Sequence, residues 1–92
     1  MKELKTNFIG KGQVKGFKFT QVKKTDFGHI YKVDDFGAVW YEVFRRVENY
    51  RYSCISYPTN KAFGVWAWTA KSLSRANEIL EDIKTKSEVQ NV

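Results

Sequence analysis

The sequence predicts an α+β fold: an antiparallel β-meander of about five strands with one C-terminal amphipathic helix packed on a face. Aromatic and β-branched residues, which favour strands, dominate several short runs between residues 14 and 69, and turn residues separate these runs. From Ser72 onward the apolar residues recur at helical spacing. A chain of 92 residues has room for one domain, so residues 1–92 are expected to form a single unit.

The first elements lie in the N-terminal third of the chain. Residues 1–7 are mostly polar and are expected to form a loose tail, with Phe8-Ile9 docking on the sheet or pairing with it. Gly10-Lys11-Gly12 is a turn signal. Val14–Val22 alternates with the period of a strand, and Ile30–Val33 reads as a second, shorter strand.

The stretch Asp35–Pro58 is predicted to be a long antiparallel hairpin and the spine of the sheet. Its two runs, Ala38–Val47 and Tyr50–Tyr57, are rich in aromatic and β-branched residues. They flank Glu48-Asn49, and Asn tolerates the positive φ that a tight two-residue turn requires. The other segments are therefore expected to pair with this hairpin.

A strand and a helix complete the predicted fold. Phe63–Thr69 reads as a strand that carries Trp66 and Trp68 on one face, opposite its smaller residues. Ser72 is a good N-cap for the helix, and residues 86–92 are expected to be a loose tail. The apolar stripe that would pack on the sheet consists of Leu73, Ala76, Ile79, Leu80 and Ile83.

The charge of the chain is concentrated near its N-terminus. The net charge is +6, and residues 1–25 account for all of it, with seven lysines and one glutamate (7 − 1 = +6). Such an asymmetry indicates an acidic partner such as nucleic acid. The alternative is that lysines on an exposed edge strand prevent edge-to-edge aggregation.

Basic residues interleaved with aromatic ones favour a nucleic-acid-binding surface, single-stranded nucleic acid above all. Sheets that bind single strands combine cationic grooves with rings on which bases stack. In the predicted hairpin Arg46 faces Arg51, and this like-charged pair would need Glu48 or a phosphate nearby. The alternative is that the rings form the core and the arginines cover them. The predicted contact residues are Lys11, Lys15, Lys18, Lys23, Lys24, Arg45, Arg46, Arg51, Tyr50 and Tyr52.

A second hypothesis is a protein-binding accessory or inhibitor module. Trp66 and Trp68 would form an exposed aromatic patch, together with Tyr57, if the helix covers the opposite side of their strand. The same tryptophans could instead form the core. Aromatic residues make up 16% of the chain, a large share for so small a domain, so a homodimer could cover part of this surface.

No arrangement of residues predicts an enzyme, a metal site or a cofactor. Asp-Phe-Gly occurs twice, at 26–28 and 35–37, but the other kinase motifs do not fit in a chain of this length. The single His29 and single Cys54 could form a base and a nucleophile, although Cys beside apolar residues is more typical of a core. Asp34 and Asp35 are adjacent, so a strand would point them to opposite faces.

Two resemblances accompany these patterns. Antiparallel strands followed by one helix are similar in order to the single-stranded-DNA-binding fold of the transcriptional positive-cofactor family, a likeness of topology that implies nucleic-acid binding only by analogy. The stretches GQVKGFKF, YEVFRRVEN and YPTNKAFGVWAWTAKSLSRANEILEDI resemble small proteins of phages and mobile elements, over about residues 12–83. That resemblance implies no catalytic residues and no established activity. A host protein is the partner expected for the alternative, phage-type accessory or inhibitor module.

The sequence also bears on the compartment. A single cysteine cannot form an intramolecular disulfide, and no stretch reaches the roughly 18 apolar residues of a membrane span. The N-terminal residues lack the apolar region of a signal peptide. We therefore expect a cytoplasmic protein without a membrane partner.

Overall fold

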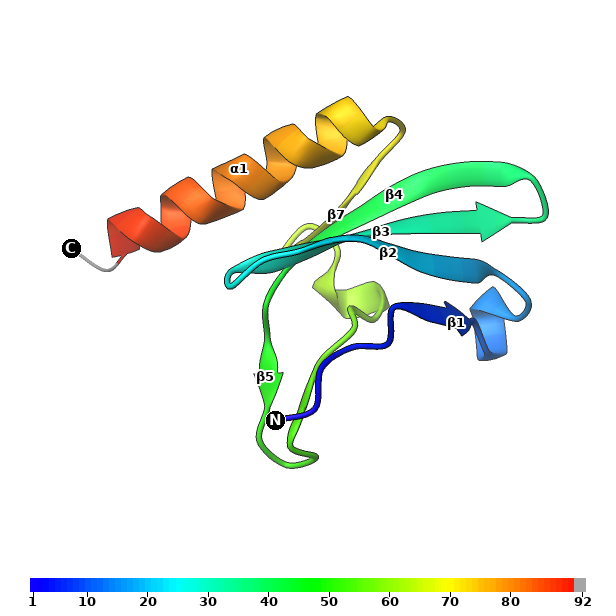
Figure 1. Cartoon of the computed structure of the whole chain (residues 1–92), viewed down its shortest axis with the longest axis horizontal. Coiled ribbons are helices and arrows are strands. Elements are labelled where there is room, and N and C mark those ends of the chain that lie inside the picture. Colours follow the sequence, from blue (N-terminus) through cyan, green and yellow to red (C-terminus); the bar gives the residue numbers. More distant parts are fainter. Residues whose placement is uncertain (91–92) are drawn as a thin grey trace.

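The computed structural model describes the backbone of residues 1–90 and the side chains of residues 1–87, and it confirms the α+β class. One antiparallel sheet has the order β1-β2-β3-β4-β7, and the C-terminal helix α1 (Leu73–Gln90) packs on it (Figure 1). Its strands are β1 (Asn7–Ile9), β2 (Lys18–Lys24), β3 (Gly28–Asp35), β4 (Ala38–Arg45) and β7 (Ala67–Ala70). The remaining elements are β5 (Glu48–Asn49), β6 (Cys54–Ile55) and the 3₁₀ helices η1 (Gly12–Val14) and η2 (Asn60–Ala62).

The spine of the sheet is the β3–β4 hairpin, so the prediction of a long hairpin over Asp35–Pro58 is wrong. β4 pairs along its whole length with β3 on one side, and its second half pairs with β7 on the other. Both edges of β4 are therefore occupied, and the chain after it leaves the sheet. It forms a small two-stranded ribbon in which Glu48 pairs with Ile55 and Asn49 with Cys54. The reversal thus lies at residues 50–53 and not at Glu48-Asn49.

The β3–β4 hairpin closes through a two-residue turn at Phe36-Gly37. Asp35 pairs with Ala38, and both turn residues have positive φ, 50° for Phe36 and 105° for Gly37. This is the pattern of a type I′ turn, which matches the twist of the flanking strands. The Asp34 carboxylate accepts a hydrogen bond from the Gly37 amide at 2.8 Å and holds the turn closed.

The helix covers one end of one sheet face. Ala76, Leu80 and Ile83 are buried against Ile30 and Val43, and Ile79 is partly buried beside them. Most of the predicted apolar stripe is therefore the packing surface, but its first residue, Leu73, is exposed. The predicted N-cap is also confirmed, because the Ser72 hydroxyl accepts a hydrogen bond from the Arg75 amide at 3.2 Å. The helix continues through Gln90, so residues 86–90 are not the predicted tail; residues 91–92 lie outside the described part of the chain.

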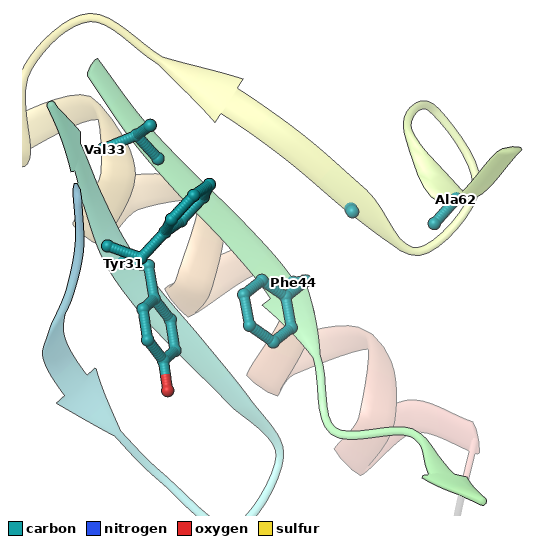
Figure 2. Packing of buried hydrophobic residues seen from close by; sticks show 6 residues of the cluster. Tyr31, Val33, Phe44 and Ala62 are labelled. Carbon is teal, nitrogen blue, oxygen red and sulfur yellow. The ribbon is translucent and has the colours of Figure 1, made fainter. Parts of the chain in front are cut away.

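The opposite face holds an aromatic layer. Tyr31 and Phe44 lie side by side on β3 and β4 with their ring centroids 5.7 Å apart, and both are fully buried (Figure 2). Phe19 of β2 and Tyr57 complete this layer, which β1 and residues 57–66 cover. Both faces of the sheet are therefore packed, although the helix covers only part of its own side.

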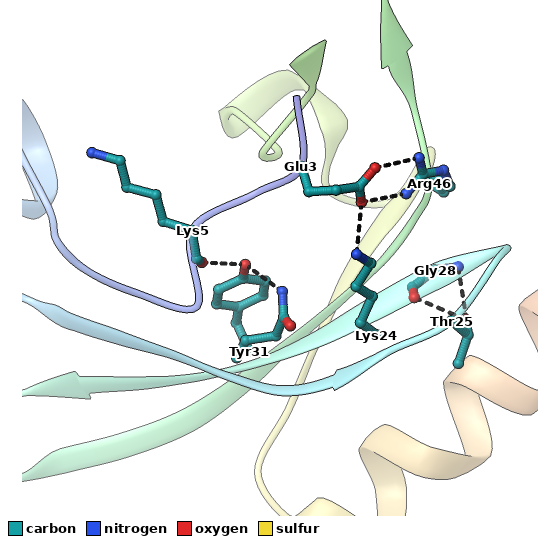
Figure 3. Close-up of polar contacts among 8 residues, drawn as sticks. Glu3, Lys5, Lys24, Thr25, Gly28, Tyr31 and Arg46 are labelled. Carbon is teal, nitrogen blue, oxygen red and sulfur yellow. Dashed lines mark hydrogen bonds and ion pairs between the residues drawn. The ribbon is translucent and has the colours of Figure 1, made fainter. Parts of the chain in front are cut away.

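The N-terminal residues are held in place, contrary to the predicted loose tail over residues 1–7. The Lys2 amide donates to the Ser53 carbonyl, and the Lys2 carbonyl accepts from the Ile55 amide, each at 2.8 Å. The Tyr31 hydroxyl donates to the Lys5 carbonyl at 2.6 Å (Figure 3). The predicted pairing of Phe8-Ile9 is confirmed by β1.

Three predicted strands have different limits. β2 begins at Lys18 and not at Val14, because Gly12 and Gly16 adopt positive φ around η1. β3 is longer than Ile30–Val33 at both ends. β7 begins at Ala67, because residues 64–66 form a turn in which Gly64 has φ 86°. Within residues 1–90 no helix combines the length and the apolar character needed to cross a membrane.

Candidate nucleic-acid interface

Three predicted contact residues, Lys11, Lys15 and Lys18, belong to one end of the sheet. Lys11 and Lys15 lie in the loop that joins β1 to β2, and this loop is closed by hydrogen bonds from the Gly10 amide to the Phe17 carbonyl (2.8 Å) and from the Gly16 amide to the Gly10 carbonyl (3.1 Å). Lys18 follows at the start of β2. All three lysines are exposed, so the loop presents their charge to solvent.

Phe36 lies over this loop and is the most exposed large apolar residue of the described chain. Its side chain is 82% exposed, and its ring occupies the space where a Cβ on Gly16 would fall, 2.8 Å from Cζ. A left-handed backbone is a genuine outlier for a bulky residue, since type I′ turns prefer Asn or Asp at this position. The turn therefore holds an unburied ring in a strained conformation beside the lysine loop.

Lys32 extends the same surface onto the sheet. It is the Cα partner of Thr20 on one side and of Tyr41 on the other, next to the row in which Lys18 pairs with Asp34. The helix packs over the opposite end of this face, and the β3–β4 hairpin reaches past it (Figure 1). We call Lys11, Lys15, Lys18, Lys32 and Phe36 the basic end.

Two acidic residues reduce the net positive charge of the basic end. Asp34 and Asp35 lie in the same hairpin, and they leave a local excess of two positive charges (4 − 2 = +2). The Asp34 carboxylate is engaged with the turn amide of Gly37. Among residues 1–87 the structure shows no ion pair for the four lysines, so their charges are available to an anion.

Lys24 and Arg46 serve a structural purpose instead. The Arg46 guanidinium donates two hydrogen bonds of 2.7 Å to the Glu3 carboxylate, and the Lys24 ammonium lies 3.2 Å from it (Figure 3). The hydrogen bond from Arg46, more than the one from Lys24, lowers the pKa of Glu3 from 4.5 to about 2. The predicted pairing of Arg46 with Arg51 is wrong, because the hairpin on which it depended does not form.

Glu3→Gln is expected to loosen the N-terminal segment and to lower the free energy of unfolding. The amide would keep one acceptor but lose the charge that attracts Arg46 and Lys24. Hydrogen exchange of the Ile55 amide, which bonds to the Lys2 carbonyl, should become faster. Since the pKa of Glu3 is depressed, its stabilisation is present above pH 4.5 and is lost as the pH falls toward 2. Unchanged exchange at Ile55 would contradict this assignment.

The other predicted cations lie apart from the basic end. Lys23 extends toward the helix, where its ammonium is 3.4 Å from the Asn77 side-chain oxygen. Arg45 lines a groove of about 560 Å³ between α1 and residues 63–69. Among the described residues, no contact connects Lys23 or Arg45 with Lys11 or Lys15.

Tyr50, Arg51 and Tyr52 form the tip of the β5–β6 ribbon. The two tyrosines are 77% and 67% exposed, and the Arg51 guanidinium lies 5.4 Å from the Tyr52 ring centroid. The Tyr50 hydroxyl donates to Glu48 at 2.6 Å. Because the ribbon is separate from the main sheet, Tyr52 does not face Arg45.

The predicted exposed patch of Trp66, Trp68 and Tyr57 does not form. Trp66 packs on Phe44 in the aromatic layer, whereas Trp68 packs in the layer under the helix, so the two rings do not share a face. Tyr57 is half-buried, and its hydroxyl donates to Glu42 at 2.6 Å. Burial and the Glu42 carboxylate raise the pKa of Tyr57 far above its ordinary value.

Lys32 and Phe36 were missed by the reasoning from sequence. The available signal for Phe36 was the Asp-Phe-Gly of residues 35–37, a two-residue turn between two strands of alternating pattern. The Phe-Gly pair recurs at residues 27–28, 36–37 and 63–64, a repetition that favours the same role, packing across a turn, for all three Phe residues. Phe27 and Phe63 do pack against the two core clusters, but Phe36 does not.

No protein-family model matches the chain, and no curated protein and no solved structure matches it.

Proposed function

We propose that this protein is a small, non-enzymatic nucleic-acid-binding module that binds single strands at the basic end. The observation that carries the proposal is the exposed Phe36 ring, held in a left-handed turn over the loop of Lys11 and Lys15. Bases stack on such rings, and lysines contact the phosphates between them. On the sequence grounds given above, we place this activity in the cytoplasm.

The charge distribution supports the same proposal. Of the seven lysines within residues 1–25, the structure shows an ion pair only for Lys24 among residues 1–87. Exposed apolar side chains lie beside the lysines of the basic end. Lysines that only prevented edge-to-edge aggregation would not need exposed apolar neighbours. These apolar residues are Ile9, Val14, Phe36 and Val39.

Reversing Lys11, Lys15 and Lys18 together to Glu is expected to abolish binding of a labelled oligothymidylate, measured by fluorescence anisotropy. For wild type, three phosphate contacts predict a slope of about −2 for the logarithm of affinity against that of salt concentration. A matched control reverses Lys71, Lys84 and Lys86, which lie in α1 or just before it, and produces the same net charge (+6 − 6 = 0). The control should retain most of the affinity.

The comparison of these two variants decides the proposal. Equal losses would mean that only net charge matters, and no wild-type binding in 20 mM salt would exclude nucleic acid as the partner. Duplex DNA of the same length provides the second comparison, because the exposed ring needs unpaired bases. Tighter binding of the duplex would contradict the preference for single strands.

A second candidate function, binding to a host protein or to a second copy of the chain, is favoured by the ribbon tip. Tyr50, Arg51 and Tyr52 are residue types that dominate interface hot spots, and they are all exposed. Light scattering of wild type and of a Tyr50→Ser/Tyr52→Ser variant tests the homodimer. A monomeric wild type would leave only a different protein as the partner of this tip.

A further inference from the structure

A pocket on the aromatic side of the sheet lies next to the basic end. It has a volume of about 540 Å³ and lies between β1, the β1–β2 loop and residues 57–63. Its lining shares Ile9, Lys11 and Val14 with the surface described above. A strand bound to Lys11 would therefore lie at the opening of this pocket, whereas Lys18 and Lys32 belong to the helix side of the sheet.

The walls of the pocket are largely aromatic. Phe8 and Phe19 stack with their centroids 4.7 Å apart, and Tyr57 meets both rings edge-on at 5.3 and 5.5 Å. Phe63 also lines the pocket. Such walls favour a flat apolar ring over a flexible polar ligand, because a flat ring can fill the space and lose its hydration at little cost.

One carboxylate, that of Glu42, lies among these rings. Its Oε1 accepts a short hydrogen bond of 2.6 Å from the Tyr57 hydroxyl, whereas Oε2 has only a long contact of 3.4 Å from the Trp40 indole nitrogen. An ionised carboxylate has about four lone-pair sites, so acceptor capacity remains on both oxygens. Tyr57 fixes the orientation of the carboxylate, and a ligand with N–H donors would complete its hydrogen bonds.

The rim of the pocket is positively charged, opposite in sign to the Glu42 carboxylate inside it. Lys5 and Lys11 line it and are exposed, whereas Glu42 is half-buried on the sheet. A ligand that fits therefore has hydrogen-bond donors at its flat end and negative charge at the other. A nucleotide has this division between its base and its phosphate.

Among the common bases, guanine matches the carboxylate best. Its Watson–Crick edge presents two adjacent donors, N1–H and the exocyclic amine, whereas adenine and cytosine offer one amine beside an acceptor and thymine one N–H between acceptors. Both donors can bond to one carboxylate. The edge is free only in an unpaired nucleotide, which agrees with a single-stranded ligand.

We propose that this pocket binds a guanine base, with Glu42 accepting hydrogen bonds from its N1–H and its exocyclic amine and with Lys5 and Lys11 close to the phosphate. The inference rests on the proposed function where the guanine belongs to a strand, and the same chemistry is offered by a free guanine nucleotide. In the strand, this pocket gives the protein a preference for guanine at one position while the basic end binds any sequence.

The test compares oligothymidylates that carry one central guanine, inosine, adenine or cytosine, by fluorescence anisotropy with wild type. Inosine lacks only the exocyclic amine, so it isolates one of the two proposed hydrogen bonds. We expect guanine to bind roughly 5- to 150-fold more tightly than adenine, the range for a bidentate contact, with inosine between them. Equal affinities for all four would overturn the inference while leaving the proposed function intact.

Two variants connect the preference to the carboxylate. Glu42→Gln loses one acceptor oxygen and should remove the guanine preference without changing the affinity for plain oligothymidylate. Tyr57→Phe removes the hydroxyl that fixes the carboxylate but keeps the carboxylate itself, so it should reduce the preference for guanine less than Glu42→Gln does. Because the four-base comparison uses wild type alone, a variant that fails to fold does not prevent a decision.

Isothermal titration with GMP and with inosine monophosphate separates the two sources of guanine. Binding of GMP without binding of any oligonucleotide would support the pocket and overturn the proposed function. Guanine preference in the strand without binding of GMP would show that the base is read only within a strand. If neither GMP nor any oligonucleotide binds, both proposals are wrong.

Discussion

Replacing His29 with leucine is expected to make the protein less sensitive to acid. The imidazole is fully buried, and neither ring nitrogen has a hydrogen-bond partner among the described residues. It stacks on Phe44 at 5.2 Å. Burial, together with the positive charge of Arg46, lowers the pKa of His29 from 6.5 to about 4. The folded protein therefore resists protonation of this residue.

The direction of the effect follows from proton linkage. Below pH 6.5 the unfolded chain binds a proton on His29, whereas the folded chain does so only near pH 4, so stability falls as the pH drops through this window. The shift corresponds to about 3 kcal/mol in total, of which about 2 kcal/mol falls between pH 7 and pH 5. His29→Leu should lose this dependence. It should also gain about 1 kcal/mol at pH 7, because it removes two unpaired polar atoms.

Urea unfolding followed by tryptophan fluorescence at pH 7, 6 and 5 measures the difference. His29 is the only histidine, so no other side chain with an ordinary pKa titrates in the middle of this range. His29→Gln is the matched control, since it keeps a buried polar side chain but cannot take up the proton. If the free energy of unfolding changed equally with pH in wild type and in both variants, His29 would be protonated as easily in the folded protein as in the unfolded chain.

The elements that depend on local pattern could be predicted from the sequence. The helix and its cap at Ser72 follow from spacing within one segment, and the number of strands follows from alternation. The pairing of the strands could not be predicted in this way, because the second edge of β4 pairs with β7 and not with the nearer residues 50–57. That choice depends on burying Phe44 and Val43 on both sheet faces at once, which no local pattern contains.

The candidate site shows the same limit. The sequence predicts one cluster of positive charge at Lys11, Lys15 and Lys18, because these residues are close in the chain. They do lie at one end of the sheet. Lys24 and Arg46 could not be assigned in this way, because their partner Glu3 lies more than 20 residues from each. The Glu42 carboxylate depends on Tyr57, which reaches it from the segment that covers the aromatic layer. Long-range contacts thus decide which charged residues remain available for binding.

Phe36→Asn is expected to stabilise the protein and to weaken nucleic-acid binding at the same time. A left-handed backbone costs an ordinary L-residue about 1–2 kcal/mol, and Asn-Gly is the preferred sequence of a type I′ turn. Since the side chain is 82% exposed, little buried apolar area is lost, and we expect a gain of about 1 kcal/mol in the free energy of unfolding. Loss of one stacked base should weaken binding by about 1–3 kcal/mol.

Two further variants separate the ring from the turn. Phe36→Tyr keeps both the ring and the strain, so its stability and affinity should match wild type, whereas Phe36→Leu keeps the strain and loses only the ring, so its affinity alone should fall. Urea unfolding and anisotropy with oligothymidylate measure the two quantities for each variant. A destabilised Asn variant would show that packing of the ring over Gly16 outweighs the strain. An Asn variant with unchanged affinity would remove Phe36 from the interface, and with it the observation on which the nucleic-acid proposal depends. Strained residues cluster at binding and catalytic sites, which is why the left-handed Phe36 supports that proposal.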